Sequence, residues 1–260
     1  ETCDVAVHSL KDLPTGAALG LTIAATPKRV DVRDVLCARD GLKLADLPQG
    51  AKVGTGSPRR AAQLRAARPD LAVQDIRGNV DTRLGRVPGL PGNAAGAPGD
   101  LDAVVLAAAG LERIGRLDAV SEFFETDVML PAPGQGALAI ECRTADAPRK
   151  AGSTEGSQGV LAQALAALND DDTRLAVTAE RAVLARLEAG CAAPVGAFAH
   201  RKGSMLYLEA AVCAVDGTRT VREKKATDGL TEVGATLLGI EVAELLLAAG
   251  AAEIADLAAS

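Results

Sequence analysis

The stretch AKVGTGSPRR, from Ala51 to Arg60, decides the fold class of this 260-residue chain. Val53 lies in a short strand-like segment, and the glycines of Gly54-Thr55-Gly56 allow a tight turn after it. Ser57 is a typical helix N-cap, and Pro58 suits the first helical position. The stretch therefore predicts a strand, a turn and a helix in direct succession.

The alternation of strands and helices continues after this stretch. Strand-like segments are expected at residues 71–76 and 101–107, with a helix at 80–86 between them. This order is typical of parallel βαβ units and predicts an α/β sheet. After Asp170 the pattern changes, which predicts a separate, smaller α+β unit. Its expected elements are a helix at 178–188, strands at 196–200 and 205–215, and an amphipathic helical end at 233–259.

The remaining segments are interpreted from the same patterns. Residues 3–8 and 21–25 read as short strands, and residues 9–14 as a polar loop between them. Two stretches rich in small residues, 87–100 and 151–159, are expected to be surface loops.

The composition excludes several classes of protein. Lys and Arg number 28 against 34 Asp and Glu, and this net charge of −6 argues against a general nucleic-acid binder. The chain has only three Phe, one Tyr and no Trp, so it offers few aromatic rings on which nucleic-acid bases could stack. Two histidines, and five cysteines without a CxxC pair, argue against a metal site and a disulfide framework. No segment has the ~18 uncharged apolar residues expected of a membrane-spanning helix.

Arginines gather where predicted strands give way to helices. Arg59 and Arg60 open one helix, Arg77 ends the next strand, and Arg83 lies in the helix that follows. Because loops at the carboxyl ends of neighbouring parallel strands open on one crevice, we expect these side chains to converge there. Arg113, after the third strand, is a further candidate. Such a crevice fits a polyanionic small ligand, although each arginine could instead pair with a nearby Asp or Glu.

Asp12 and Cys191 are the candidates for chemistry outside this set. Asp12 follows Lys11 in the loop before Leu13-Pro14, where an extended chain would point neighbouring side chains to opposite sides. Cys191 follows Gly190, a natural helix terminator, and is expected on a loop. Each also has an ordinary interpretation, as a turn aspartate near a surface lysine and as an inert apolar cysteine.

Six stretches, in order along the chain, together resemble the porphobilinogen deaminase family. They are DVAVHSLKDLP (residues 4–14), residues 53–64, RGNV with TRL (77–84), LPAPGQGA (130–137), AER (179–181) and residues 187–196 around Cys191. Each stretch is moderately specific alone, whereas the ordered set is very specific. The resemblance implies a transferase with hydroxymethylbilane synthase activity. Four porphobilinogen molecules are joined stepwise, ammonia leaves each time, and water releases the linear tetrapyrrole.

The resemblance also implies an α/β fold of two domains like type II periplasmic binding proteins, with the active site in the cleft between them. A small α+β C-terminal domain would carry the cofactor. The expected boundaries are 1–30 with 135–165 for domain 1, 31–134 for domain 2 and 170–260 for the C-terminal domain. The family has a further N-terminal part, so the first domain is expected to be incomplete here.

Roles for individual residues follow from the same resemblance. A dipyrromethane cofactor is expected on Cys191 through a thioether bond, and no metal is expected. Asp12 would stabilise the cationic azafulvene-like species that remains when ammonia leaves, and would help to move protons. The acid groups of the cofactor would be held by Lys11, Ser9, Thr55, Ser57, Arg59 and Arg60, and those of the substrate or growing chain by Arg77, Arg83 and Arg113.

The alternative is a two-lobed protein that binds a polycarboxylate without chemistry, or an inactive fragment. Cys191 discriminates between the two, because a mere binder does not need it. We expect a monomer that takes porphobilinogen and binds neither nucleic acid nor membrane. The expected location is the cytoplasm, and a plastid location stays open.

Overall fold

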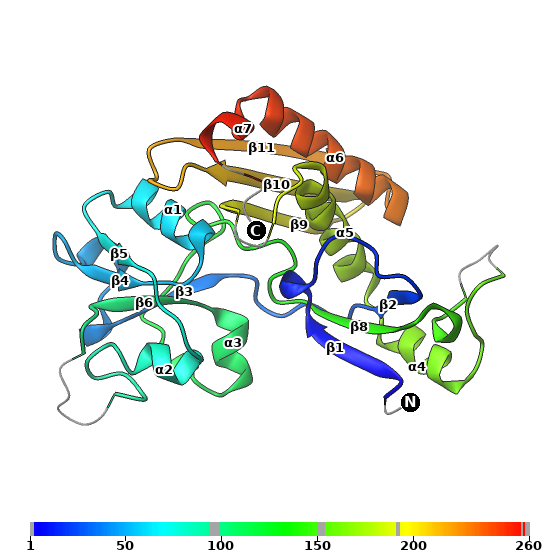
Figure 1. The fold of residues 1–260 in the computed structure, drawn as a ribbon, viewed down its shortest axis with the longest axis horizontal. Coiled ribbons are helices and arrows are strands. Elements are labelled where there is room, and N and C mark those ends of the chain that lie inside the picture. The colour runs from blue at the N-terminus through cyan, green and yellow to red at the C-terminus, as the bar shows by residue number, and fades with distance from the viewer. Residues whose placement is uncertain (1–2, 94–98, 150–153, 191–192, 256, 258–260) are drawn as a thin grey trace.

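Three β-sheets organise the chain, and the computed structural model describes residues 3–93, 99–149, 154–190, 193–255 and 257. Figure 1 shows the sheets in three separate parts of the molecule, each accompanied by its own helices. The chain passes from the first sheet to the second, returns to the first and then enters the third. This is the mixed α/β architecture that the sequence predicts.

The first sheet has three antiparallel strands in the order β1-β8-β2. Its elements are β1 (Val5–Ser9), β2 (Leu21–Ala25), β8 (Leu138–Arg143) and the helix α4 (Val160–Leu168). The strands β1 and β2 are confirmed, whereas β8 and α4 are not predicted from the sequence. The expectation of an extended loop after β1 is wrong, because Leu10–Asp12 form one turn of 3-10 helix with Leu10 buried beneath it.

The second sheet has five strands in the order β5-β4-β6-β3-β7. These are β3 (Asp34–Ala38), β4 (Lys52–Gly54), β5 (Ala72–Gln74), β6 (Ala103–Ala107) and β7 (Glu122–Phe123). The parallel pairing of β4 with β5 and β6 is confirmed. β3 runs antiparallel to β6 and β7, so the sheet is mixed and not all-parallel.

Helices cover both faces of this sheet. They are α1 (Pro58–Ala67), α2 (Val80–Leu84) and α3 (Ala108–Arg113). Leu64 of α1 packs in the same buried cluster as Leu36, whereas Leu84 and Leu111 pack with Val35 on the other side. Alternate residues of β3 therefore face opposite cores, as the two-residue period of a strand requires. Further 3-10 turns lie at Arg39–Gly41, Leu44–Asp46, Leu117–Ala119 and Thr144–Asp146.

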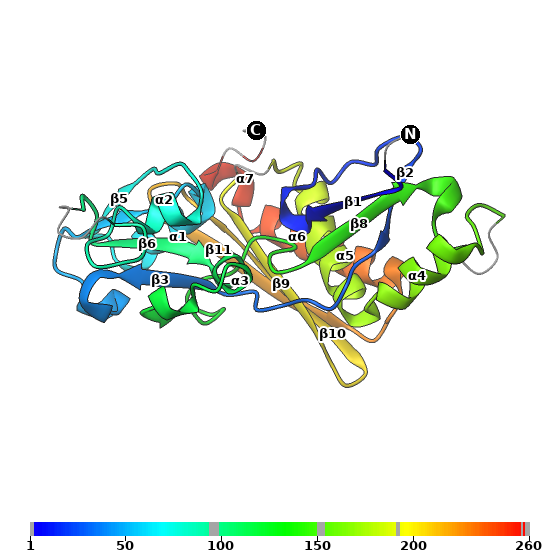
Figure 2. The same ribbon diagram turned by 90° about the horizontal axis from the view of Figure 1, so that it is seen from below.

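The third sheet has antiparallel strands in the order β11-β10-β9, with helices packed against one face (Figure 1). The elements are α5 (Asp171–Arg186), β9 (Val195–Lys202), β10 (Met205–Cys213), β11 (Thr220–Thr227), α6 (Glu232–Ala248) and α7 (Ala251–Ile254). The helix α5 begins earlier than predicted, because the Asp170 side chain accepts a hydrogen bond from the Thr173 N–H and caps it. β11 is not predicted. Figure 2 shows the β9–β10 hairpin projecting away from the body.

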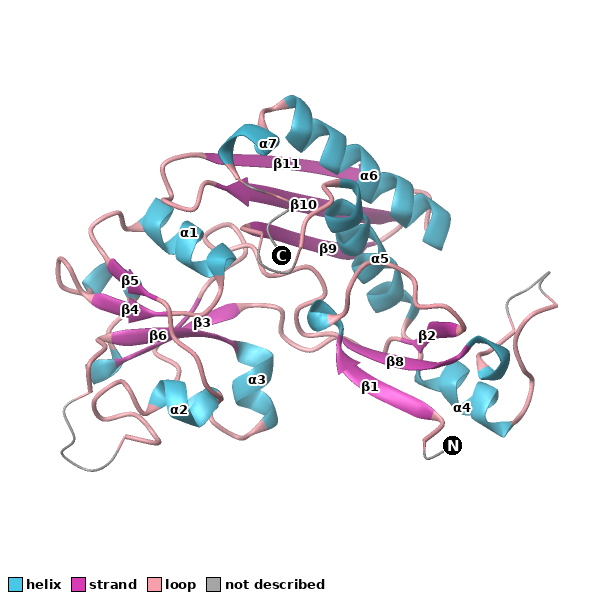
Figure 3. Ribbon diagram, in the orientation of Figure 1, coloured by secondary structure: helices cyan, strands magenta, loops and turns pink. Residues whose placement is uncertain are grey.

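Two linking segments, residues 26–33 and 124–137, run between the first and second sheets (Figure 3). They lie side by side, because the Val30 N–H donates to the Gly136 carbonyl at 3.1 Å. No described helix is both long enough and apolar enough to cross a bilayer. Of the two stretches expected as surface loops, residues 94–98 and 151–153 lie outside the described residues.

A buried ion pair ties these linking segments to the third sheet. Arg29 donates two hydrogen bonds to Glu180 of α5, at 2.6 and 3.0 Å, and Glu180 is fully buried. Glu180 also accepts from the backbone N–H groups of Gly134 and Ala199. Both carboxylate oxygens thus have partners from separate parts of the chain, which is the condition under which a buried charge is tolerated.

Candidate active site

A cavity of about 460 Å³ lies where the three parts of the molecule meet. Its walls include Lys11 beside the first sheet, Ser57 and Arg59 from the start of α1, and Gly190 and Ala193 beyond α5. The predicted cofactor residue Cys191 lies outside the described residues. Its described neighbours Gly190 and Ala193 line the cavity.

The junction between β4 and α1 forms as predicted. The Ser57 side chain accepts a hydrogen bond from the Arg60 N–H, and Pro58 is the first residue of the helix. Thr55 is buried, and its hydroxyl oxygen accepts from the Ser57 N–H at 3.3 Å. The local capping residues therefore direct the first turn of α1, with Arg59, towards the cavity.

Arg59 and Arg60 are both buried and share one carboxylate, Asp34 of β3. Each guanidinium forms an ion pair with Asp34 at 2.7 Å. Burial alone would raise the pKa of Asp34, but the two arginines hold it at about 2, so the carboxylate stays charged. Arg60 also donates to Val105 and Gln135, whereas Arg59 lines the cavity. For Arg59 and Arg60 the alternative that the sequence left open therefore holds, because both pair with a nearby acid.

Lys11 is a half-buried cation close to this cluster. Burial lowers its pKa to about 8, and the positive charges of Arg60 and Arg59 act in the same direction. The carboxylates of Asp12 and Asp34 oppose this shift without cancelling it. Lys11 therefore stays mostly protonated at pH 7 and loses its proton as the pH rises through about 8, unless a negative group enters the cavity beside it.

We expect the affinity of the cavity for a polycarboxylate to fall as the pH rises from 7.5 to 9. Free Lys11 becomes neutral above about pH 8, and only its charged form makes the charge-assisted hydrogen bond, so the affinity should fall severalfold, at most about eightfold for one titrating group. Calorimetric titration with citrate, in two buffers of different ionisation enthalpy, measures the affinity and the uptake of a proton on binding. In Lys11→Arg, which stays charged, the fall should disappear; an equal fall in both proteins would contradict the assignment.

Arg83 and Arg77 extend the positive region beyond Arg60. Burial lowers the pKa of Arg83, and the charges of Arg60 and Arg77 lower it further, so the three guanidinium groups influence one another. Arg83 Nε donates to the Gly78 carbonyl at 2.8 Å. A Cβ at Gly56 would lie 2.5 Å from the Ile76 carbonyl oxygen, so a glycine there lets the two strand-end loops approach. Arg83 therefore lies near enough to Arg60 and Arg77 to feel their charges, but of the four arginines expected to share a crevice, only Arg59 is among the described residues that line the cavity.

The remaining candidates are less closely joined to this set. Asp12 is exposed at the end of the 3-10 turn, beside Lys11. Ser9 is half-buried at the end of β1. Arg77 is 82% exposed and lies 3.3 Å from Asp75, an arrangement that contributes little to stability. Arg113 is exposed at the end of α3, and it makes no ion pair with another residue of the described ranges.

Several residues that shape the site are missed by the sequence analysis. Asp34 stands alone in the otherwise apolar strand β3, and a charged residue in such a strand indicates a buried partner. Gln135 bridges this cluster, because its Nε2 donates to Asp34 at 2.9 Å and to the Val32 carbonyl. Arg29 and Glu180 carry no comparable local signal, since their partners come from distant parts of the chain.

Fold and site together define an α/β cleft protein with a positively charged wall suited to acid-bearing ligands. The family model described as "Porphobilinogen deaminase, dipyromethane cofactor binding domain" matches residues 1–151, and the model of the porphobilinogen deaminase C-terminal domain matches residues 174–248. The chain belongs to the porphobilinogen deaminase family.

Curated relatives agree with this assignment over almost the whole chain. A porphobilinogen deaminase of Cutibacterium acnes is 59% identical over an alignment 269 residues long. The alignment covers 99% of this chain and 78% of the relative. Porphobilinogen deaminases of Leifsonia xyli and Thermobifida fusca are each 54% identical, covering 98% of this chain and 74% and 76% of those relatives.

Proposed function

We propose that this protein is a hydroxymethylbilane synthase, which joins four porphobilinogen molecules with release of ammonia in tetrapyrrole biosynthesis. The observation that carries the proposal is the cavity in which Lys11, Ser57 and Arg59 face the segment that flanks Cys191. Porphobilinogen carries an acetate and a propionate group, so a growing chain of pyrroles is a polyanion. The charged wall supplies the opposite charge, and bidentate guanidinium groups suit carboxylates.

The residues present fit a dipyrromethane cofactor attached to Cys191. Arg59 lines the cavity, and its buried Nε has no hydrogen-bond partner among the described residues. A carboxylate of the cofactor would supply that partner, and Lys11 and Ser57 would hold further acid groups. When bound, the cofactor provides the pyrrole carbon to which the first substrate unit is joined. Ser9, Thr55 and Arg60 complete the proposed set of cofactor-binding residues.

Asp12 acts on the substrate in this proposal. The C–N bond of the porphobilinogen aminomethyl group breaks, ammonia leaves, and positive charge spreads over the pyrrole ring. The Asp12 carboxylate stabilises that charge through the pyrrole N–H, and it accepts the proton lost when the new C–C bond restores the aromatic ring. Arg77, Arg83 and Arg113 would hold acid groups of the incoming unit or the growing chain.

Intact mass spectrometry of the purified protein tests the function. We expect the mass of two linked pyrrole units added to the chain, located on Cys191 by peptide mapping and absent from Cys191→Ser. The control Cys3→Ser removes an exposed cysteine and should keep the adduct. An unmodified thiol in protein supplied with porphobilinogen would support the alternative, a polycarboxylate-binding protein without chemistry.

The proposal extends to domains, assembly and location. The first sheet would belong to domain 1 (1–30 with 135–165), the second to domain 2 (31–134) and the third to the C-terminal domain (170–260). We propose a monomer in the cytoplasm that does not bind nucleic acid. Its partner is the small-molecule substrate alone.

A further inference from the structure

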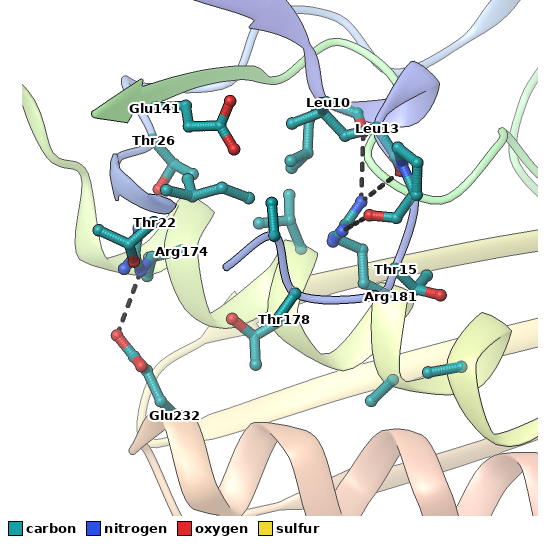
Figure 4. A pocket seen from close by; sticks show the side chains of 18 of the residues that line it. Leu10, Leu13, Thr15, Thr22, Thr26, Glu141, Arg174, Thr178, Arg181 and Glu232 are labelled. Atoms are coloured by element: carbon teal, nitrogen blue, oxygen red, sulfur yellow. Dashed lines mark hydrogen bonds and ion pairs between the residues drawn. The ribbon is translucent and has the colours of Figure 1, made fainter. Parts of the chain in front are cut away.

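Arg181 of α5, the helix that packs against the third sheet, holds the turn that carries Lys11 and Asp12. Its guanidinium donates to the carbonyl oxygens of Leu10 at 3.4 Å, Leu13 at 3.0 Å and Pro14 at 2.5 Å. Figure 4 shows its guanidinium pointing at this turn. The carbonyls of Leu10 and Leu13 stand on either side of Lys11 and Asp12, so the contact fixes both ends of the turn.

The loop that follows the turn has open space on both sides. The 460 Å³ cavity lies on one side, and a second cavity of about 620 Å³, shown in Figure 4, lies on the other. Residues 13–16 and Arg181 line both cavities and so form the wall between them. Pro14, Thr15 and Gly16 are exposed, so packing alone gives this wall little support.

The position of Arg181 also connects two proposed functional groups. Arg181 lies on α5, and the chain beyond this helix leads through Gly190 to Cys191. Its guanidinium contacts the turn that holds Asp12. An arginine with three backbone carbonyls as acceptors is well suited to this task, because its planar donors are fixed relative to one another.

We propose that Arg181 is a positioning residue, which sets the place of the Asp12 carboxylate relative to the segment that carries Cys191. The inference rests on the proposed function. Arg181 contacts the backbone of the turn and acts through Asp12. A displacement of about 1 Å in a reacting group can cost about 10²-fold in rate, so loss of the three hydrogen bonds should reduce turnover strongly.

Two substitutions and one control test this role in the full chain. Arg181→Met removes the donors and keeps a long side chain, and Arg181→Lys keeps the charge. Arg186→Met is the control, because Arg186 lies on the same helix, is 41% exposed and pairs only with Glu244 among the described residues. For Arg181→Met we expect kcat to fall about 10²-fold while KM changes less than about threefold. Arg181→Lys should recover part of the loss, and Arg186→Met should match the wild type.

Hydrogen exchange supplies a readout that does not depend on activity. Within residues 10–16, the hydrogen-bonded amides of Leu10 and Leu13 should exchange at least about tenfold faster in Arg181→Met than in the wild type, while amides of β9 and β10 stay unchanged. Unchanged exchange at residues 10–16 would overturn the inference whatever the activity. A parallel fall of kcat, Tm and Cys191 adduct would also overturn it, since that pattern means general unfolding. A wild-type chain without adduct or turnover would instead contradict the proposed function. Hydrogen exchange would still test whether Arg181 holds the turn.

Discussion

Asp12→Asn is expected to lower kcat by about 10³-fold while cofactor content and porphobilinogen binding stay close to the wild type. The substitution keeps the size and polarity of the side chain but removes the negative charge that, in the proposed mechanism, stabilises the developing cation. Electrostatic stabilisation by one group typically contributes about 10²–10³-fold, and proton transfer by a positioned side chain about 10²–10⁴-fold. The charge of Asp12 also acts on neighbouring Lys11, so the substitution alters a site that is already strongly charged.

The measurement is single-turnover formation of hydroxymethylbilane, together with intact mass to count bound pyrrole units. Asp4→Asn is a matched control, because Asp4 is a 72% exposed aspartate from the same end of the chain, paired with Arg143 at 3.3 Å. We expect the control to match the wild type. A kcat for Asp12→Asn within tenfold of the wild type would remove Asp12 from its proposed role.

Asp34→Asn is expected to reduce the free energy of unfolding by about 3–5 kcal/mol, the usual effect of removing one partner of a buried charge pair. The side chain of Asp34 is fully buried between Arg59 and Arg60, which are only 4% and 7% exposed. Without the carboxylate, two buried guanidinium groups repel each other and lose their common partner. Because both arginines belong to the proposed cofactor site, the Cys191 adduct should decrease as well.

Urea unfolding at pH 7 measures this effect. The control Asp40→Asn alters a 73% exposed aspartate whose ion pair with Arg39 is 3.3 Å long, and it should cost less than about 0.5 kcal/mol. The dependence of the unfolding free energy on pH below about 4 gives an independent check. The pKa of Asp34 is about 2 in the folded protein, below its ordinary value, so its stabilising effect should be lost as the pH falls from about 4 towards 2. A loss below about 1 kcal/mol for Asp34→Asn would contradict the assignment.

Prediction from the sequence works best where the signal is local. Ser57 and Pro58 predict the start of α1, and the structure has the helix begin there with the predicted cap. Short strands with little alternation are harder to recognise, and β3 and β7 are missed. The eight-residue β11 is missed because most of its residues are polar or charged. The 3-10 turn at Leu10–Asp12 is also missed, because the following Leu13-Pro14 favours an extended chain and the hydrogen bonds from Arg181 come from a distant helix.

The order of motifs in the sequence was by itself enough to determine the family, the acid-bearing kind of ligand and the helix starts that present arginines to it. These features depend on residue types and on neighbours within a few positions. Only the tertiary structure decided that Arg59 and Arg60 share Asp34, that burial brings the pKa of Lys11 to about 8, and that Arg181 holds the Asp12 turn. The physical reason is that burial and ion pairing depend on distances between groups far apart along the chain, which no local pattern encodes.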